Sequence, residues 1–167
     1  MKYVRSGHIA FHCRDVDESI KFYCDVFGCK LKFSISFPDL LDDVVRRNPG
    51  IDIDSVPMLK AFKEKGNKKW LTYLEFDDGF FFELFDSPSD EKALDTSKLT
   101  GYQHFSFVVE DIQETYKELL EKNIQMDGEP RLGPDNTWQL WVSDPDGNRF
   151  EIMEYTDRSY QVVGYNK

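Results

Sequence analysis

The stretch HIAFHCRDVDESIKFY, residues 8–23, recurs later in the chain as HFSFVVEDIQETYKEL, residues 104–119. Aligned without a gap, the two stretches have a histidine, a phenylalanine, an aspartate, a glutamate and a lysine at matching places. Self-similarity of this kind indicates a chain built from repeated structural units. The sequence therefore predicts two copies of one unit.

A second pair of matching stretches closes each copy. DGFFFEL, residues 78–84, matches DGNRFEI, residues 146–152, at its aspartate, glycine, phenylalanine and glutamate. Each copy thus opens with a histidine, His8 or His104, and closes with a glutamate, Glu83 or Glu151. Glu83 lies in a run of phenylalanines, where an unpaired carboxylate is costly, so we expect it to be partnered, protonated or at an edge.

The stretches that carry these residues alternate with the period of two that is typical of a half-buried strand. In HIAFHC the two histidines alternate with Ile9, Phe11 and Cys13. In the second copy we expect a strand over residues 102–109, YQHFSFVV, with His104 facing away from its phenylalanines. If the more apolar face packs on a helix, each unit presents its histidine and glutamate on the opposite, concave face.

Helix signals follow both first strands. Asp15 and Asp111 stand where a helix N-cap is expected, apolar residues follow at helical spacing, and Gly28 is placed to end the first helix. The order of strand, helix and further strands predicts an α+β fold of two units related by a pseudo-twofold axis. Such symmetry would bring the two histidines and the two glutamates together.

Two imidazoles and two carboxylates that converge in an apolar cleft form a ligand set for a divalent metal ion. Nitrogen and oxygen ligands suit Zn, Ni, Co, Fe or Mn better than Ca or Mg. Taken singly, a histidine near a strand start is more often structural, and a glutamate near a strand end is usually exposed. The match across both copies favours the metal site, and the metal would compensate the charge of Glu83.

Composition narrows the range of partners. The chain has 167 residues, a formal net charge of -10 and a pI near 4.8. This charge repels phosphate backbones and anionic membrane surfaces, so it predicts a small-molecule substrate and neither nucleic-acid nor membrane binding. No apolar run reaches the length of a membrane span or signal peptide, which predicts a cytoplasmic protein. The three cysteines lack a C-x-x-C pair and are expected to be reduced thiols.

Taken together, GHIAFHCRDVDESIKFYCDVFGCK, FFFELF, HFSFVVEDI and SDPDGNRFEIME resemble the vicinal oxygen chelate superfamily of glyoxalase, bleomycin-resistance and extradiol-dioxygenase proteins. The resemblance covers roughly residues 4–36 and 70–156. It implies paired βαβββ modules that form a cupped mixed sheet around a metal, with helices outside. Glyoxalase I of this family uses His or Gln, Glu, His and Glu as ligands, which correspond to His8, Glu83, His104 and Glu151.

The resemblance implies a lyase or isomerase that acts through a metal-bound enediolate. A metal that binds two substrate oxygens acts as a Lewis acid and makes the adjacent C–H more acidic. A carboxylate beside the metal, Glu151 or Glu83 with Glu151 favoured, would move the proton between neighbouring carbons. A hemithioacetal of an α-keto aldehyde would thereby become a thioester. An acyl-CoA epimerase, a ring-cleaving dioxygenase and a non-catalytic binding protein are the alternatives on this scaffold.

Two departures from glyoxalase I leave the thiol open. Four residues after the first ligand, where glyoxalase I usually has an arginine that contacts glutathione, this chain has His12. Four residues after the first glutamate, where it usually has an asparagine, this chain has Ser87. The candidate substrate contacts are His12, Trp141 and Arg131, the last on a loop at residues 128–136 that is a candidate lid.

The predicted organisation is a first module at residues 1–95, with a helical insertion at about 38–69, and a second module with a tail at residues 96–167. The insertion carries a cluster of lysines, which is either a solvated face or a receptor for an anionic substrate tail. The sequence leaves open whether the two modules close on each other within one chain or across a homodimer. The lysines of this cluster are Lys60, Lys63, Lys65, Lys68 and Lys69.

Overall fold

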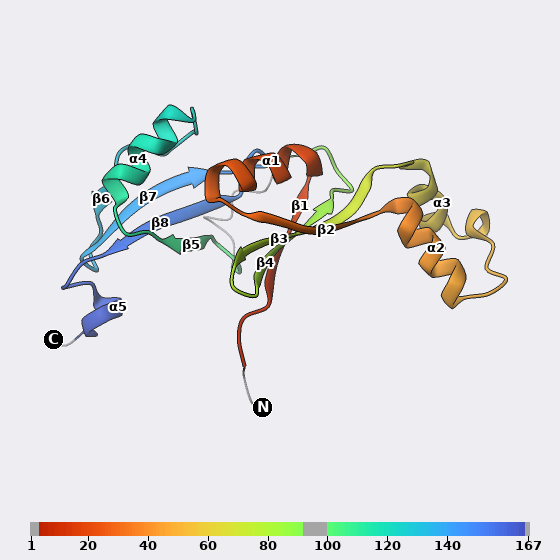
Figure 1. Cartoon of the computed structure of the whole chain (residues 1–167), viewed down its shortest axis with the longest axis horizontal. Helices are drawn as coiled ribbons and strands as arrows, with labels where there is room; N and C mark the ends of the chain where they lie inside the picture. Colours follow the sequence, from red (N-terminus) through yellow and green to blue (C-terminus); the bar gives the residue numbers. More distant parts are fainter. Residues whose placement is uncertain (1–3, 92–99, 166–167) are drawn as a thin grey trace. The chain divides into compact units, whose positions relative to one another are not determined.

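The computed structural model describes residues 4–91 and 100–165, and the chain divides into two compact units, residues 1–91 and 92–167. The boundary predicted between residues 95 and 96 lies outside the described residues. Each unit is built on one four-stranded mixed sheet (Figure 1).

The first unit has the strand order β1-β4-β3-β2, in which β1 runs parallel to β4 and the other pairs are antiparallel. Helix α1 packs across β3, β4 and β2 (Figure 1). The elements of this module are β1 (His8–Cys13), α1 (Val16–Phe27), β2 (Lys30–Ser36), β3 (Lys69–Asp77) and β4 (Phe80–Asp86).

The second unit repeats this arrangement with the order β5-β8-β7-β6, in which β5 is parallel to β8. Helix α4 packs on β7 and β8. Its elements are β5 (Phe105–Val108), α4 (Ile112–Glu121), β6 (Arg131–Leu132), β7 (Thr137–Ser143), β8 (Arg149–Tyr155) and the short α5 (Tyr160–Val163). The α+β class and the two βαβββ modules are therefore confirmed.

Local side-chain chemistry begins and ends the paired helices as the sequence predicts. The Asp15 carboxylate accepts hydrogen bonds from the backbone N–H groups of Asp17 and Glu18, and Asp111 caps α4 in the same way. Gly28 ends α1 with φ of 68°, a left-handed conformation that glycine adopts without a Cβ clash. These caps fix the residues at which both helices begin and at which α1 ends.

Aromatic side chains form the core between helix and sheet in each unit. In the first, the fully buried Phe82 ring lies 5.1 Å from Tyr23 and 5.9 Å from Phe11, measured between centroids. In the second, Phe107 stacks on Phe150 at 5.6 Å. Burying one such ring contributes about 1.5–3 kcal/mol. Because these rings occupy the helix-facing side of the strands, the histidines and glutamates lie on the other side.

The first unit is longer because of an insertion between β2 and β3. It consists of α2 (Phe37–Arg47), the 3₁₀ turn η1 (Ile53–Ser55) and α3 (Pro57–Glu64). Ser36 caps α2 through a reciprocal hydrogen-bonded box with Asp39, and Pro57 opens α3. The two helices pack on each other beside β2 and β3 (Figure 1).

Two expectations are corrected in the second unit. The strand predicted over residues 102–109 begins only at Phe105, because pairing with β8 starts at Phe150, so His104 immediately precedes the strand. The segment at residues 128–136 is not a free lid: Arg131 and Leu132 form β6, and the residues after them make a hydrogen-bonded hairpin turn.

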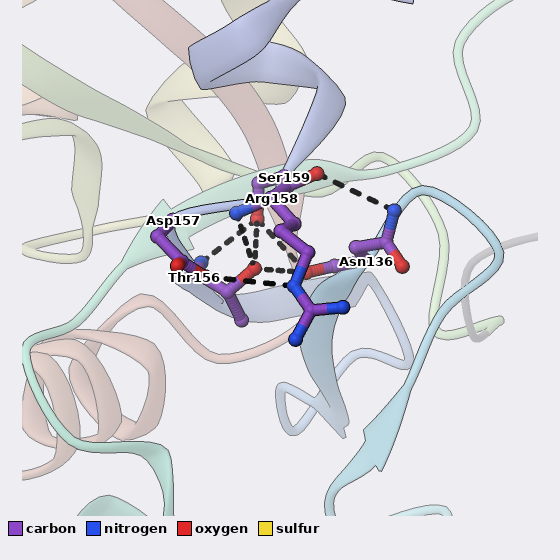
Figure 2. A network of polar contacts seen from close by, with 5 residues as sticks. All are labelled: Asn136, Thr156, Asp157, Arg158 and Ser159. Atoms are coloured by element: carbon purple, nitrogen blue, oxygen red, sulfur yellow. Dashed lines mark hydrogen bonds and ion pairs between the residues drawn. The ribbon is translucent and has the colours of Figure 1, made fainter.

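The C-terminal segment holds that hairpin turn in place. The Thr156 and Ser159 hydroxyls both donate to the Asn136 carbonyl oxygen, and Asn136 donates through its side-chain amide to the Arg158 carbonyl oxygen (Figure 2). Gln161 donates to the Asp135 carboxylate at 2.6 Å. The tail therefore anchors the start of β7.

The remaining sequence predictions concern thiols and membranes. Cys13, Cys24 and Cys29 form no disulfide bond in the described residues. Among the described residues, no helix has both the length and the apolar character needed to cross a bilayer.

Candidate metal centre

His8 and Glu83 meet in the first unit, on neighbouring parallel strands. His8 is the first residue of β1 and stands opposite Phe81, while Glu83 stands opposite Ala10, so both side chains leave the same face of the sheet. Nε2 of His8 lies 3.2 Å from Oε2 of Glu83. The Glu83 side chain is 13% exposed and that of His8 is 47% exposed, so the carboxylate is sheltered and the imidazole is open. Glu83 therefore has a partner within the first unit, and the metal that the sequence predicts beside it stays a prediction.

His104 and Glu151 form a second pair with the same geometry. Nε2 of His104 lies 3.2 Å from Oε2 of Glu151, whose side chain is 9% exposed. Burial raises the pKa of Glu151 above its ordinary value, the charge and hydrogen bond of His104 lower it in part, and Asp135 raises it further. The two units therefore present the same His–Glu pair at corresponding places.

An aromatic side chain accompanies each pair, on the adjacent antiparallel strand and directly opposite the glutamate. Tyr73 stands opposite Glu83 on β3, donates a hydrogen bond to its carboxylate, and has its ring 5.8 Å from that of His8. Trp141 stands opposite Glu151 on β7, with its ring 4.8 Å from that of His104. Burial, followed by the hydrogen bond and charge of Glu83, raises the pKa of Tyr73.

Tyr73 was not among the sequence candidates, although a signal for it exists. When the two closing stretches are aligned, Tyr73 precedes Glu83 by the same spacing as Trp141 precedes Glu151. Extending the alignment backwards from the glutamates also matches Trp70 with Trp138. The signal was missed because the aligned closing stretches begin at Asp78 and Asp146, after these residues.

Arg149 is a second residue that sequence reasoning missed. Its guanidinium carbon lies 4.4 Å from the centre of the Trp141 ring, and its Nη2 lies 2.7 Å from Oδ2 of Asp127. The corresponding position in the first unit is Phe81, whose ring lies 5.8 Å from that of Tyr73. The two pairs thus have different neighbours, cationic in the second unit and apolar in the first.

The other candidate substrate contacts lie farther along the strands. His12 is exposed on the same face of β1 as His8, and its ring lies 5.9 Å from Phe85. Arg131 is exposed on the edge strand β6, in register with Gln139. The role of both residues in substrate binding stays a prediction.

The lysine cluster of the insertion is largely engaged in ion pairs. Lys63 pairs with Asp54 at 3.0 Å, Lys65 with Asp86 at 2.5 Å, and Lys69 with Asp17. Because these three ammonium groups already have carboxylate partners, the solvated, structural interpretation of the cluster is favoured over a receptor for a substrate anion.

The donor set and its spacing fit a divalent metal ion. Two ligands that each lie about 2.1 Å from one ion, at a tetrahedral or octahedral angle, are about 3.0–3.4 Å apart, which includes the spacing of both pairs. In the described part of the chain, no group of three or more His, Cys, Asp or Glu side chains is arranged to hold a metal. Each pair supplies two ligands.

Comparison with known proteins identifies the family of the chain. Residues 5–152 match the family model of the Glyoxalase/Bleomycin resistance protein/Dioxygenase superfamily. The chain belongs to this superfamily. Its two βαβββ units match the two-module fold of this superfamily.

Relatives within the superfamily are distant. The chain is 27% identical over 154 residues to a protein from Arabidopsis thaliana named probable lactoylglutathione lyase, chloroplastic. That match covers 90% of this chain and 35% of the relative, so the chain spans about a third of the relative's length.

Solved structures show the glyoxalase-superfamily fold at low identity. Lactoylglutathione lyase from Agrobacterium tumefaciens matches with a TM-score of 0.57 and 18% identity, over 92% of this chain and 96% of that one. The fosfomycin resistance protein FosX from Listeria monocytogenes, in complex with Mn(II) and sulfate, matches with a TM-score of 0.59 and 13% identity, over 96% and 99% of the two chains.

Proposed function

We propose that the protein is a metal-dependent lyase or isomerase of the glyoxalase I type, which converts a hemithioacetal of an α-keto aldehyde into a thioester. The observation that supports this most directly is the repetition of one His–Glu pair, with Nε2 and Oε2 3.2 Å apart, in both units. A single His–Glu contact is common in proteins, but two at corresponding places of a repeat favour a shared ligand role.

In this proposal the metal ligands are His8, Glu83, His104 and Glu151, and the ion is Zn, Ni, Co, Fe or Mn. A divalent ion there would supply Lewis-acid stabilisation of the negative charge that develops on the substrate oxygens. The protein imidazoles and carboxylates suit these metals better than Ca or Mg. FosX, which has the same fold, carries Mn(II) in its crystal structure.

Glu151 is the proposed proton carrier. It removes the proton from the carbon that bears the thiol sulfur and returns it to the neighbouring carbon, while the hydroxyl proton of the first carbon passes to the carbonyl oxygen of the second, so the proton count balances. Glu83 is the less suitable of the two because it accepts hydrogen bonds from the Tyr73 hydroxyl in addition to its His8 contact, which ties its oxygens to two partners. Glu151 faces the Trp141 indole at the corresponding place.

Metal content tests the ligand set. The protein has only three histidines, so His8→Ala and His104→Ala can be compared with His12→Ala, which replaces the remaining one. Elemental analysis of the purified proteins should find about one divalent ion per site in wild type and in His12→Ala, and a loss of it in the other two. No metal in wild type, and no uptake from Zn, Ni, Co, Fe or Mn, would leave a non-catalytic binding protein.

Turnover tests the reaction. The metal-loaded protein should form a thioester from α-keto aldehydes with at least one of several thiols. Glutathione is only one member of the series, because His12 and Ser87 depart from the usual glutathione contacts. An isomerase consumes no oxygen, so oxygen uptake with catechols would indicate a dioxygenase. Exchange of a substrate α-proton in deuterated water without net product would indicate an epimerase.

Two further expectations accompany the proposal. We propose a cytoplasmic location, which localisation of a tagged protein would check. We also propose that the protein can form a homodimer, and light scattering after size-exclusion chromatography would distinguish it from a monomer.

A further inference from the structure

Arg149 occupies a distinctive place beside the His104–Glu151 pair. It lies two residues before Glu151 on β8, so both side chains leave the same face of the sheet. Trp141 stands opposite Glu151 on the neighbouring strand, so it lies on that face too. The guanidinium carbon of Arg149 lies 4.4 Å from the centre of the Trp141 ring, and the centre of the His104 ring lies 4.8 Å from it. The Trp141 ring therefore contacts both the Arg149 guanidinium group and the proposed metal ligand His104.

Arg149 is a cation in a protein whose net charge is strongly negative. The chain carries a net charge of -10, and the residue at the corresponding position of the first unit is the apolar Phe81. Stacking on an indole holds a guanidinium in a defined plane while leaving its N–H edge available. A planar fork of N–H donors matches the two oxygens of a carboxylate.

The ion pair of Arg149 with Asp127 still allows the guanidinium group to bind a carboxylate ligand. Its pair with Asp127 is open to solvent, with side chains 47% and 49% exposed. Exposed ion pairs contribute little to stability, so a carboxylate ligand can replace Asp127 at small cost. Asp127 also shows that this position accepts a carboxylate, since its Oδ2 lies 2.7 Å from Nη2 of Arg149.

We propose that Arg149, whose guanidinium carbon lies 4.4 Å from the centre of the Trp141 ring, binds the carboxylate of an anionic substrate, so that the thiol part of the hemithioacetal carries an acid group. The inference rests on the proposed function, because it places the substrate beside His104 and Glu151. It selects Arg149 rather than Arg131, which lies on the edge strand in register with Gln139.

A matched pair of probes tests this assignment by equilibrium binding. S-benzylthioglycolate carries a carboxylate, and its primary amide has nearly the same shape without the charge. Isothermal titration calorimetry of the wild-type protein should show about tenfold tighter binding of the acid than of the amide. An acidic protein without a dedicated cation would repel the acid instead.

Three variants locate the preference. Arg149→Gln should abolish it, Asp127→Asn should increase it because the competing carboxylate is gone, and Arg131→Gln should leave it unchanged. Circular dichroism checks that each variant is folded. Equal binding of acid and amide to wild type, no binding of either, or a preference that survives in Arg149→Gln would overturn the proposal.

Metal content of the same samples separates this inference from the proposed function. A preference that depends on Arg149 in a protein unable to bind metal would support the anion site and reject the metal-dependent reaction. A protein that binds metal through the two His–Glu pairs but does not prefer the acid would support the proposed metal site and reject the anion site.

Discussion

Replacing Tyr73 by phenylalanine removes one hydroxyl group and leaves the ring in place. That hydroxyl donates to Glu83, whose carboxylate also contacts His8 at 3.2 Å. The ring keeps its stacking on Phe33, with centroids 4.9 Å apart. The change therefore tests a single hydrogen bond to a proposed metal ligand.

The expected magnitude follows from the surroundings of the pair. A buried hydrogen bond to a charged group contributes ~1.5–3 kcal/mol, but Tyr73 is only half-buried and Glu83 keeps its His8 partner, so we expect a loss of about 1 kcal/mol in the free energy of unfolding without metal. Partners that orient a metal ligand typically affect metal affinity by 10–100-fold. Because the Tyr73 side chain is only half-buried, the lower end applies, so Tyr73→Phe should weaken Zn binding about tenfold.

The pH dependence of stability has a definite sign. The pKa of Tyr73 is raised in the folded protein, so the native state holds its proton more tightly than the unfolded chain. The associated stability is fully present below the unfolded pKa of 10.0 and is lost as pH rises through the folded pKa. Tyr73→Phe should remove this part of the loss above pH ~10.

Two assays check these expectations. Urea unfolding of the metal-free proteins measures the stability change, and competition with a chromophoric chelator measures Zn affinity. Tyr155→Phe, at an exposed position at the end of β8, is the control and should change neither quantity. If Tyr73→Phe binds Zn as tightly as wild type and unfolds at the same urea concentration, Tyr73 does not position Glu83.

Three further predictions concern other charged or titrating groups. Lys65→Met leaves the buried Asp86 carboxylate without its ion pair and should cost about 2 kcal/mol by urea unfolding, whereas Lys63→Met, in an exposed pair, should cost about 0.5 kcal/mol. Cys29, whose pKa is raised by burial to about 12, should resist alkylation by iodoacetamide at neutral pH until the protein unfolds, as mass spectrometry would show. The raised pKa of Glu151 means that metal-free protein loses stability as pH rises from the unfolded pKa of 4.5 through the folded value. Glu151→Gln should flatten this part of the plot of unfolding free energy against pH. An unchanged plot would contradict the raised pKa of Glu151.

Much of the fold was predictable because it depends on local patterns. Alternation in HIAFHC requires only that one side of the strand is buried, and Asp15 and Asp111 cap helices through hydrogen bonds to residues two and three positions away. The late start of the strand at Phe105 was not predictable, because a strand begins where its partner is available and that partner is more than forty residues away in the chain.

The site was predictable only in part. His8, Glu83, His104 and Glu151 emerged from the repeat, and the structure joins them as two pairs. Loop 128–136 has the composition of a lid, but hydrogen bonds from the C-terminal segment hold it as a hairpin turn (Figure 2). Composition reports the tendency of a segment to bend, and it does not report which distant residues bind it.

By itself, the sequence determined that two similar units exist, which strand and helix each begins with, and which histidine and glutamate each contributes. These features follow from period, caps and internal repetition, all of which are local properties of the chain. Only the tertiary structure decided which side chains surround the pairs. Tyr73 reaches Glu83 and Trp141 faces Glu151 because hairpin register places them directly across the sheet, and Arg149 stacks on Trp141 because both leave the same face. Register and facing are set by pairing between strands, so they become visible only when the strands are assembled.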